Sequence, residues 1–137
     1  MTSPIDFRSL TGTELALLVA ADRSDNDDGS PYFFDASAAE WRFELIEPAI
    51  LGAFESTTQA RSWIEAEIQM FQEDGQELRA DFYRQMLAEG FTEPVTVGQI
   101  GVEGRLWDGW HRTAIAIVRG ELLPAIVGTP HGYRRAE

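Results

Sequence analysis

Six consecutive residues, Trp107 to Arg112, combine two tryptophans, an Asp-Gly pair, one of the two histidines and an arginine. They follow an apparent β-hairpin (Pro94 to Trp107) and precede a helix rich in alanine and isoleucine (Thr113 to Arg119). A strand that turns through glycine into a helix start presents outward-pointing backbone N–H groups, which attract anions. Gly109 lets a ligand approach the backbone closely, and Arg112 adds a planar donor fork suited to phosphate oxygens. The stretch therefore predicts a phosphate site that needs no lysine.

The composition of the chain limits the chemistry available to it. Its 137 residues predict one domain with a core large enough to fold alone. The absence of cysteine excludes disulfides, thiolate metal sites and cysteine nucleophiles. The net charge of −12 opposes sequence-independent DNA binding, and the absence of lysine excludes a P-loop. With no apolar run near the ~20 residues of a membrane span and no secretory signal, we expect a cytoplasmic protein without a membrane partner.

Hydrophobic spacing predicts the elements that must position the six residues. Thr11 and Glu14 have the spacing of a capping box, which predicts a helix over 11–21 with an apolar stripe. An acidic loop is expected to follow over 22–31. Two further helices are expected, and each ends at a glycine. The expected helices are Thr58 to Glu73, with Ile64, Ile68 and Phe71 on its apolar face, and Glu77 to Glu89, with Leu78, Phe82 and Met86. The expected strands are Trp41 to Ile46, with Trp41, Phe43 and Leu45 on one side, then Pro94 to Ile100, Arg105 to Trp107 and Leu122 to Val127.

The order of these elements predicts an α/β (α+β) fold, a small mixed sheet covered by helices. We expect an N-terminal helix and acidic loop over 1–36, the main domain over 37–128, and a polar tail over 129–137.

Residues 86–127 resemble the ParB/sulfiredoxin-like superfamily. Members show a helix ending in Gly-(Leu/Phe), then Pro-(Val/Ile)-x-Val, a hairpin, a (Asp/Gly)-Gly-x-(His/Arg)-Arg turn, an alanine-rich helix, and a closing Gly and Pro-x-Ile-Val. The matching stretches here are Gly90 to Val97, Leu106 to Ala114 and Gly120 to Val127.

The resemblance implies a ParB/sulfiredoxin-like core that binds a nucleotide triphosphate such as ATP or CTP with Mg²⁺, and either transfers or hydrolyses its phosphate. The residues it implies for nucleotide or phosphate binding are Pro94, Thr96, Gly109, Trp110, His111, Arg112 and Thr113. Asp108 matches the acidic position that serine-kinase-like members use in catalysis. Those members have a further catalytic Glu after the first strand. Glu47 and Glu55 both fall near that position; the alignment does not choose between them, and Glu47 stands as the predicted catalytic residue.

Departures from the superfamily pattern remove two of its activities. Trp110 stands where sulfiredoxin needs its cysteine, so sulfiredoxin's repair chemistry is excluded. The sequence shows neither a helix-turn-helix region nor a second phosphate motif of the Glu-Asn-x-x-Arg kind, so we do not expect a DNA-bound CTP clamp.

Simpler interpretations stay open beside these. Asp108 and Gly109 could form only a tight turn; Trp107 is expected in the core, and Trp110 is left undecided between core and base stacking. The segment Ser24 to Gly29 resembles a calcium loop only faintly, and His111 and His131 lack metal-ligand spacing. A competing hypothesis is a non-catalytic acidic module that docks on a basic protein surface or mimics nucleic acid, as in phages and mobile elements. The oligomeric state is not predicted.

Overall fold

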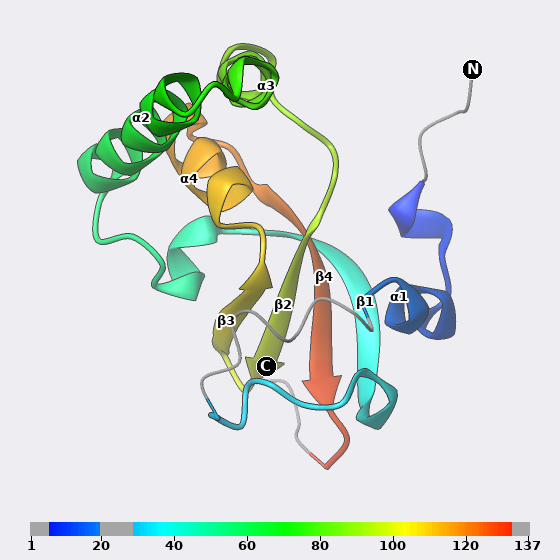
Figure 1. Cartoon of the computed structure of the whole chain (residues 1–137). Helices are drawn as coiled ribbons and strands as arrows, with labels where there is room; N and C mark the ends of the chain where they lie inside the picture. The colour runs from blue at the N-terminus through cyan, green and yellow to red at the C-terminus, as the bar shows by residue number, and fades with distance from the viewer. Residues whose placement is uncertain (1–5, 20–28, 133–137) are drawn as a thin grey trace.

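The computed structural model describes residues 6–19 and 29–132 (Figure 1). Short 3-10 turns connect several of the main elements. The helices are α1 (Gly12–Val19), α2 (Thr57–Glu73), α3 (Glu77–Glu89) and α4 (Trp110–Arg119), with 3-10 turns η1 (Phe7–Ser9), η2 (Ala36–Ala38) and η3 (Pro48–Leu51). The strands are β1 (Ala39–Ile46), β2 (Val95–Ile100), β3 (Glu103–Asp108) and β4 (Leu123–Pro130). The predicted fold class, a small mixed sheet with helices, is confirmed.

The sheet has the strand order β1-β4-β2-β3. β1 runs antiparallel to β4, β4 parallel to β2, and β2 antiparallel to β3. The crossover from β3 through α4 to β4 brings Val95 opposite Ala125, so β4 inserts between β1 and β2. The start of β2 and the end of β3 therefore lie side by side, with Thr96 paired to Asp108, and α4 begins directly beyond that point.

The two faces of the sheet carry different cores. On one face, Val95, Val97 and Leu106 pack with Ala116 of α4 and Leu51 of η3. On the other face, a cluster of buried residues joins the sheet to α1 and the segment before β1; its members are Leu15, Val19, Phe33, Trp41, Trp107 and Ile126. Figure 1 shows the resulting order in space, with α4 between the sheet and the α2–α3 pair.

Helices α2 and α3 form an outer layer over α4. Ser56 caps α2 by accepting a hydrogen bond from the Gln59 N–H at 3.0 Å. The predicted apolar face of α2 is confirmed, since Ile64, Ile68 and Phe71 are buried. They pack with Ala114 and Ile115 of α4, which carries apolar residues on both its sheet-facing and its outward sides. α4 thus packs against the sheet on one side and against the α2–α3 layer on the other. This packing fixes its first turn relative to the strands.

The predicted apolar face of α3 is wrong in part. Met86 is buried as expected, but Leu78 is 88% exposed and Phe82 is 54% exposed. The helix instead buries Ala80 and packs Tyr83 against α2. α3 carries two apolar stripes, and spacing alone cannot tell which of the two faces the core.

The N-terminal helix is part of the domain core. The predicted capping box is present, with the Thr11 N–H donating to Glu14 at 2.9 Å and the Glu14 N–H donating to Thr11 at 3.2 Å. Leu15 is 1% exposed within the cluster on the α1 face of the sheet, so α1 packs on the same core as the sheet. At the other end β4 runs to Pro130, and Thr129, predicted in the tail, is 6% exposed inside the strand.

Ser24 to Asp28, most of the calcium-like segment, lies outside the described residues. Among the residues that the structure describes, no helix is long and apolar enough to cross a membrane.

Candidate functional site at the start of α4

The turn into α4 depends on a glycine. Gly109 has φ of 108°, and a Cβ built on it would lie 2.3 Å from Cγ1 of Val95. Only a residue without a side chain fits this conformation and this close approach to β2. α4 begins at Trp110, three residues before the predicted Thr113, and its N-cap residue is Gly109, which has no side chain of its own. The backbone N–H groups of its first turn, which have no partner within a helix, therefore lie directly after the glycine.

Arg112 is held in place by the strand beside it. One terminal nitrogen of its guanidinium donates to the Pro94 carbonyl at 2.6 Å. The other lies 3.5 Å from the Asp108 carboxylate, an i,i+4 ion pair in which Arg112 is 19% exposed and Asp108 56%. The guanidinium is thus oriented by a backbone contact, while its carboxylate partner is largely in water. The structure therefore brings Asp108, Gly109 and Arg112 together as predicted.

His111 faces away from this pair. Its Nε2 lies 3.1 Å from the Glu67 carboxylate of α2, and its ring stacks on Tyr83 at 4.5 Å between ring centroids. The Trp63 ring lies 4.9 Å away. Burial lowers the pKa of His111 below its usual value, although the hydrogen bond and negative charge of Glu67 oppose the shift. The imidazole therefore links α4 to the α2–α3 layer, with its Nε2 occupied by Glu67.

Two residues predicted to contact phosphate cannot do so through their side chains. Thr113 is fully buried, and its hydroxyl donates to the Gly109 carbonyl at 2.9 Å, inside the helix turn. Thr96 is 3% exposed and lies between Val95 and Val97, whose side chains pack toward α4, so its own side chain points to the opposite face of the sheet. Pro94 is buried, and its carbonyl orients Arg112.

The predicted catalytic Glu47 does not join Asp108. Glu47 precedes η3 and lines a hollow of about 360 Å³ together with Glu55, Gly120 and Glu121. Gly120 caps the C-terminal end of α4, whereas Asp108 precedes its N-terminal end. A ten-residue helix is about 15 Å long, so Glu47 and Asp108 cannot act on one reacting group.

The two tryptophans of the turn have different environments. Trp107 is 1% exposed, and its indole N–H donates to the Tyr32 carbonyl at 2.8 Å, so its predicted place in the core is confirmed. Trp110 is 38% exposed and lies edge-on to Phe54 at 6.1 Å between ring centroids. Part of the Trp110 ring is therefore accessible beside the first turn of α4.

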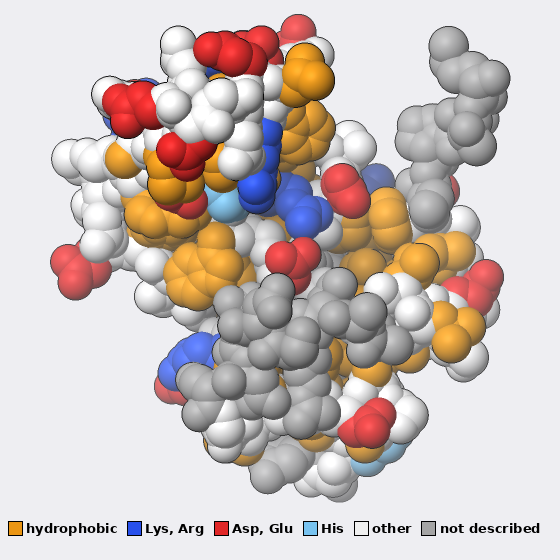
Figure 2. All heavy atoms as spheres, in the orientation of Figure 1, with side chains coloured by type: hydrophobic (Ala, Val, Ile, Leu, Met, Phe, Trp, Pro, Cys, Tyr) orange, Lys and Arg blue, Asp and Glu red, His pale blue; other side chains and the backbone are white. Residues whose placement is uncertain are grey.

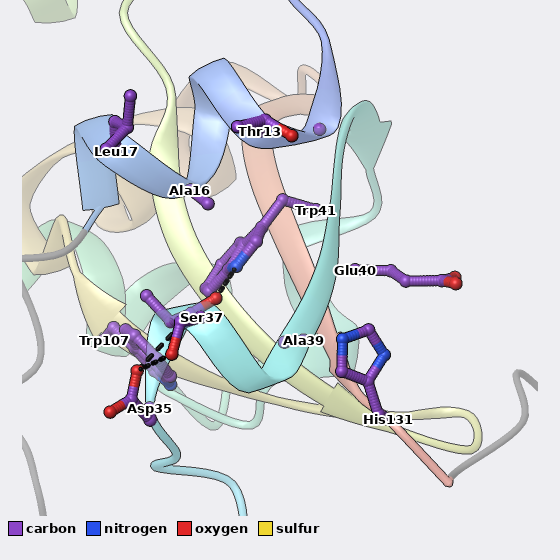
Figure 3. Close-up of a pocket in the computed structure, with 12 residues that line it drawn as sticks. Thr13, Ala16, Leu17, Asp35, Ser37, Ala39, Glu40, Trp41, Trp107 and His131 are labelled. Carbon is purple, nitrogen blue, oxygen red and sulfur yellow. Dashed lines mark hydrogen bonds between the residues drawn. The ribbon is translucent and has the colours of Figure 1, made fainter.

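A larger hollow lies on the other side of the sheet. It measures about 840 Å³ and opens between α1 and the η2–β1 segment, over Trp41 and Trp107 (Figure 3). The Asp35 carboxylate accepts hydrogen bonds from the Ser37 N–H and hydroxyl, and the Trp41 indole N–H donates to Ala36. The described residues of its lining include two carboxylates, Asp35 and Glu40, together with His131. The two carboxylates would repel a phosphate ligand.

The described residues contain no group of three or more histidine, aspartate or glutamate side chains placed to hold a metal ion. Asp108, a single exposed carboxylate, fits a different arrangement, in which Mg²⁺ arrives with the phosphates and the protein adds one ligand.

No protein-family model matches the chain, and searches of curated proteins and of solved structures found no match either. Residues 86–127 thus resemble the ParB/sulfiredoxin-like superfamily by motif, and that resemblance stays a prediction.

Proposed function

We propose that this protein binds the phosphates of a nucleoside triphosphate at the start of α4. The observation that carries the proposal is the Arg112 guanidinium, held by the Pro94 carbonyl beside a helix start that follows a glycine. A helix N-terminus carries a partial positive charge equivalent to roughly half an elementary charge. Arg112 adds a full charge with the bidentate geometry that phosphate oxygens accept. The motif resemblance, which implies that the same turn holds nucleotide phosphates, also supports the proposal.

The Asp108–Arg112 pair gives the site an exchangeable partner. An ion pair this exposed contributes about 0–1 kcal/mol, so a phosphate group can replace the carboxylate at little cost. The released Asp108 carboxylate then faces the bound phosphates, where it would repel them unless Mg²⁺ lies between. Asp108 is thus the residue that would hold the cation, and Mg²⁺ would supply charge neutralisation on the phosphate oxygens.

Of the two predicted catalytic residues, only Asp108 is placed to act on the bound nucleotide under this proposal, because Glu47 lies at the other end of α4. Asp108 would orient the attacking hydroxyl or water, and Arg112 would stabilise charge on the transferring phosphoryl group. Transfer to an acceptor and hydrolysis share these roles.

Titration calorimetry on an Arg112→Ala variant tests the proposal. We expect the wild-type protein to bind ATP, CTP or GTP in the presence of Mg²⁺, and the variant to bind it about 10- to 100-fold more weakly. That range follows from a loss of about 1.5–3 kcal/mol for a hydrogen bond to a charged group. Absence of heat with all three nucleotides at millimolar concentration would refute the proposal.

Arg119→Ala is the matched control for this experiment. Arg119 lies on the same helix, donates to the Leu87 carbonyl at 2.7 Å and pairs with Glu121 at 2.8 Å. Its side chain is 22% exposed, close to the 19% of Arg112. The two variants remove the same kinds of contact from opposite ends of α4, so a merely structural role predicts similar effects. Binding lost only in Arg112→Ala identifies the N-terminal end as the site.

A second candidate, the acidic interaction module, is favoured by a different surface. Leu78 and Phe82 are exposed on α3, and residues 57–89 carry seven carboxylates against three arginines. An apolar pair within an acidic surface suits a partner that is basic and apolar. An Arg112→Ala variant that keeps full biological activity, with no nucleotide bound by the wild type, would favour this candidate.

A further inference from the structure

Arg79 of α3 differs from the other arginines of the helical layer. Among the residues that the structure describes, it has no carboxylate within ion-pair distance, whereas Arg61, Arg84 and Arg112 each have one. Its guanidinium instead stacks over the Phe71 ring, 4.2 Å from the ring centroid. The side chain is exposed, in a chain with an excess of twelve negative charges. An unpaired guanidinium is unexpected where carboxylates are this abundant.

The stacking places Arg79 next to the start of α4. The Phe71 ring lies 5.8 Å from the His111 ring, and Arg112 follows His111 in the chain. The positive charges of both arginines also act on the imidazole, where they add to the effect of burial in lowering the pKa of His111. Figure 2 shows blue arginine side chains beside the upper of its two pale-blue patches, below the region where Figure 1 places α2 and α3. α3 and α4 thus each bring one guanidinium group close enough to His111 for its charge to act on the imidazole.

Two carboxylates near this position already have partners. Glu67 is occupied by His111 at 3.1 Å, and it is 25% exposed. Asp108 lies on the Arg112 side, at 3.5 Å. Both guanidinium charges act on the His111 ring, and a ligand with several negative charges would offset both of them. Stacking on Phe71 orients Arg79 in advance, which lowers the entropy lost when a ligand binds.

We propose that Arg79 is a second phosphate-binding residue, and that the site therefore takes a nucleotide with two or more linked phosphates in preference to a monophosphate. This inference rests on the proposed function. Arg112 and the first turn of α4 bind one phosphate group of the nucleotide. Arg79 binds the phosphate group that is linked to it.

Titration calorimetry with ATP and with AMP, both with Mg²⁺, tests the inference. We expect Arg79→Gln to weaken ATP binding about tenfold, as loss of a charged hydrogen bond predicts, and to change AMP binding by less than about twofold. Arg112→Ala weakens both ligands. The matched control is Arg84→Ala, because Arg84 lies on the same helix, is exposed, and pairs with Asp81 at 2.8 Å. It should change neither affinity by more than about twofold.

The outcomes separate the inference from the proposed function. If the wild type binds ATP and Arg79→Gln binds it equally well, the inference is overturned while the proposed function stands. Equal weakening of ATP and AMP by Arg79→Gln also overturns it, because Arg79 would then serve the same phosphate as Arg112. If the wild type binds neither ligand, the proposed function fails and the inference fails with it. Thermal unfolding without nucleotide shows that each variant is folded, and Arg79→Met keeps the packing on Phe71 without the charge.

Discussion

At the scale of single residues, Gly109 determines whether the turn can form. Both its positive φ and its close contact with Val95 oppose a side chain at this position. A second glycine that has only the positive φ separates the two effects. Gly75 has φ of 79°, but a Cβ built there would have no atom within 4 Å.

We therefore expect Gly75→Ala to lower the free energy of unfolding by about 1–2 kcal/mol, the cost of a left-handed conformation with a side chain. Gly109→Ala should cost about 1–3 kcal/mol more, because Val95 must move as well. Urea denaturation of both variants measures the difference. Equal losses would mean that β2 accommodates the Cβ freely.

The grouping of residues in the turn could be predicted from the sequence, because these residues are close neighbours in the chain. Gly109, Asp108 and Arg112 lie within five positions, and a helix brings residues four apart onto one face. Glu67 and Arg79 could not be found in this way. They reach His111 from two other helices, and nothing in their own sequence context distinguishes them from the solvated charges around them.

At the scale of elements, His111 connects α4 to the outer helical layer. Its ring packs among Trp63, Phe71 and Tyr83 and bonds to Glu67. Because the folded protein lowers the pKa of His111, the unfolded chain binds the proton more tightly. The contribution to stability is therefore fully present above the unfolded pKa of about 6.5 and is lost as the pH falls below it.

We expect the free energy of unfolding to decrease between pH 7.5 and pH 5.5, and His111→Gln to make that decrease smaller. The control is His131→Gln, since His131 is exposed beyond the end of β4. Denaturation curves at several pH values give the comparison. An unchanged pH dependence in His111→Gln would show that the imidazole is not responsible.

The same elements show where hydrophobic spacing succeeds. α2 has one apolar face, so the spacing of Ile64, Ile68 and Phe71 gave the helix within one residue of its observed start. α3 has two apolar stripes, and the predicted Leu78 and Phe82 lie on the exposed one. Burial on α3 is decided by its packing against α2 and α4, and the position of α4 depends on the sheet rather than on the sequence of α3. For the same reason the sequence could not show that Glu47 and Asp108 lie at opposite ends of α4.

At the scale of the whole molecule, α1 and the sheet share one core. Leu15 of the predicted N-terminal helix and loop segment is 1% exposed, in one buried cluster with Trp41 and Trp107. A shared core predicts that α1 and the sheet unfold together.

Leu15→Ala should lower the free energy of unfolding of the entire domain by about 2–5 kcal/mol. Leu18→Ala, on the same helix but 47% exposed, should cost much less. Far-UV circular dichroism and tryptophan fluorescence should report the same single transition in both variants. Two separate transitions would contradict a shared core and restore the N-terminal region as an independent unit.

The account depends most on the claim that nucleotide phosphates bind at the start of α4. A titration of the ¹⁵N-labelled protein with Mg-ATP, followed by amide chemical shifts, tests this claim at the residues concerned. The account predicts the largest shifts at the amides of Gly109, Trp110, His111 and Arg112, with the arginine side-chain signals of Arg112 and Arg79 also moving. The absence of shifts at millimolar Mg-ATP, or shifts confined to the hollow over Trp41 or to the outer face of α3, would contradict it.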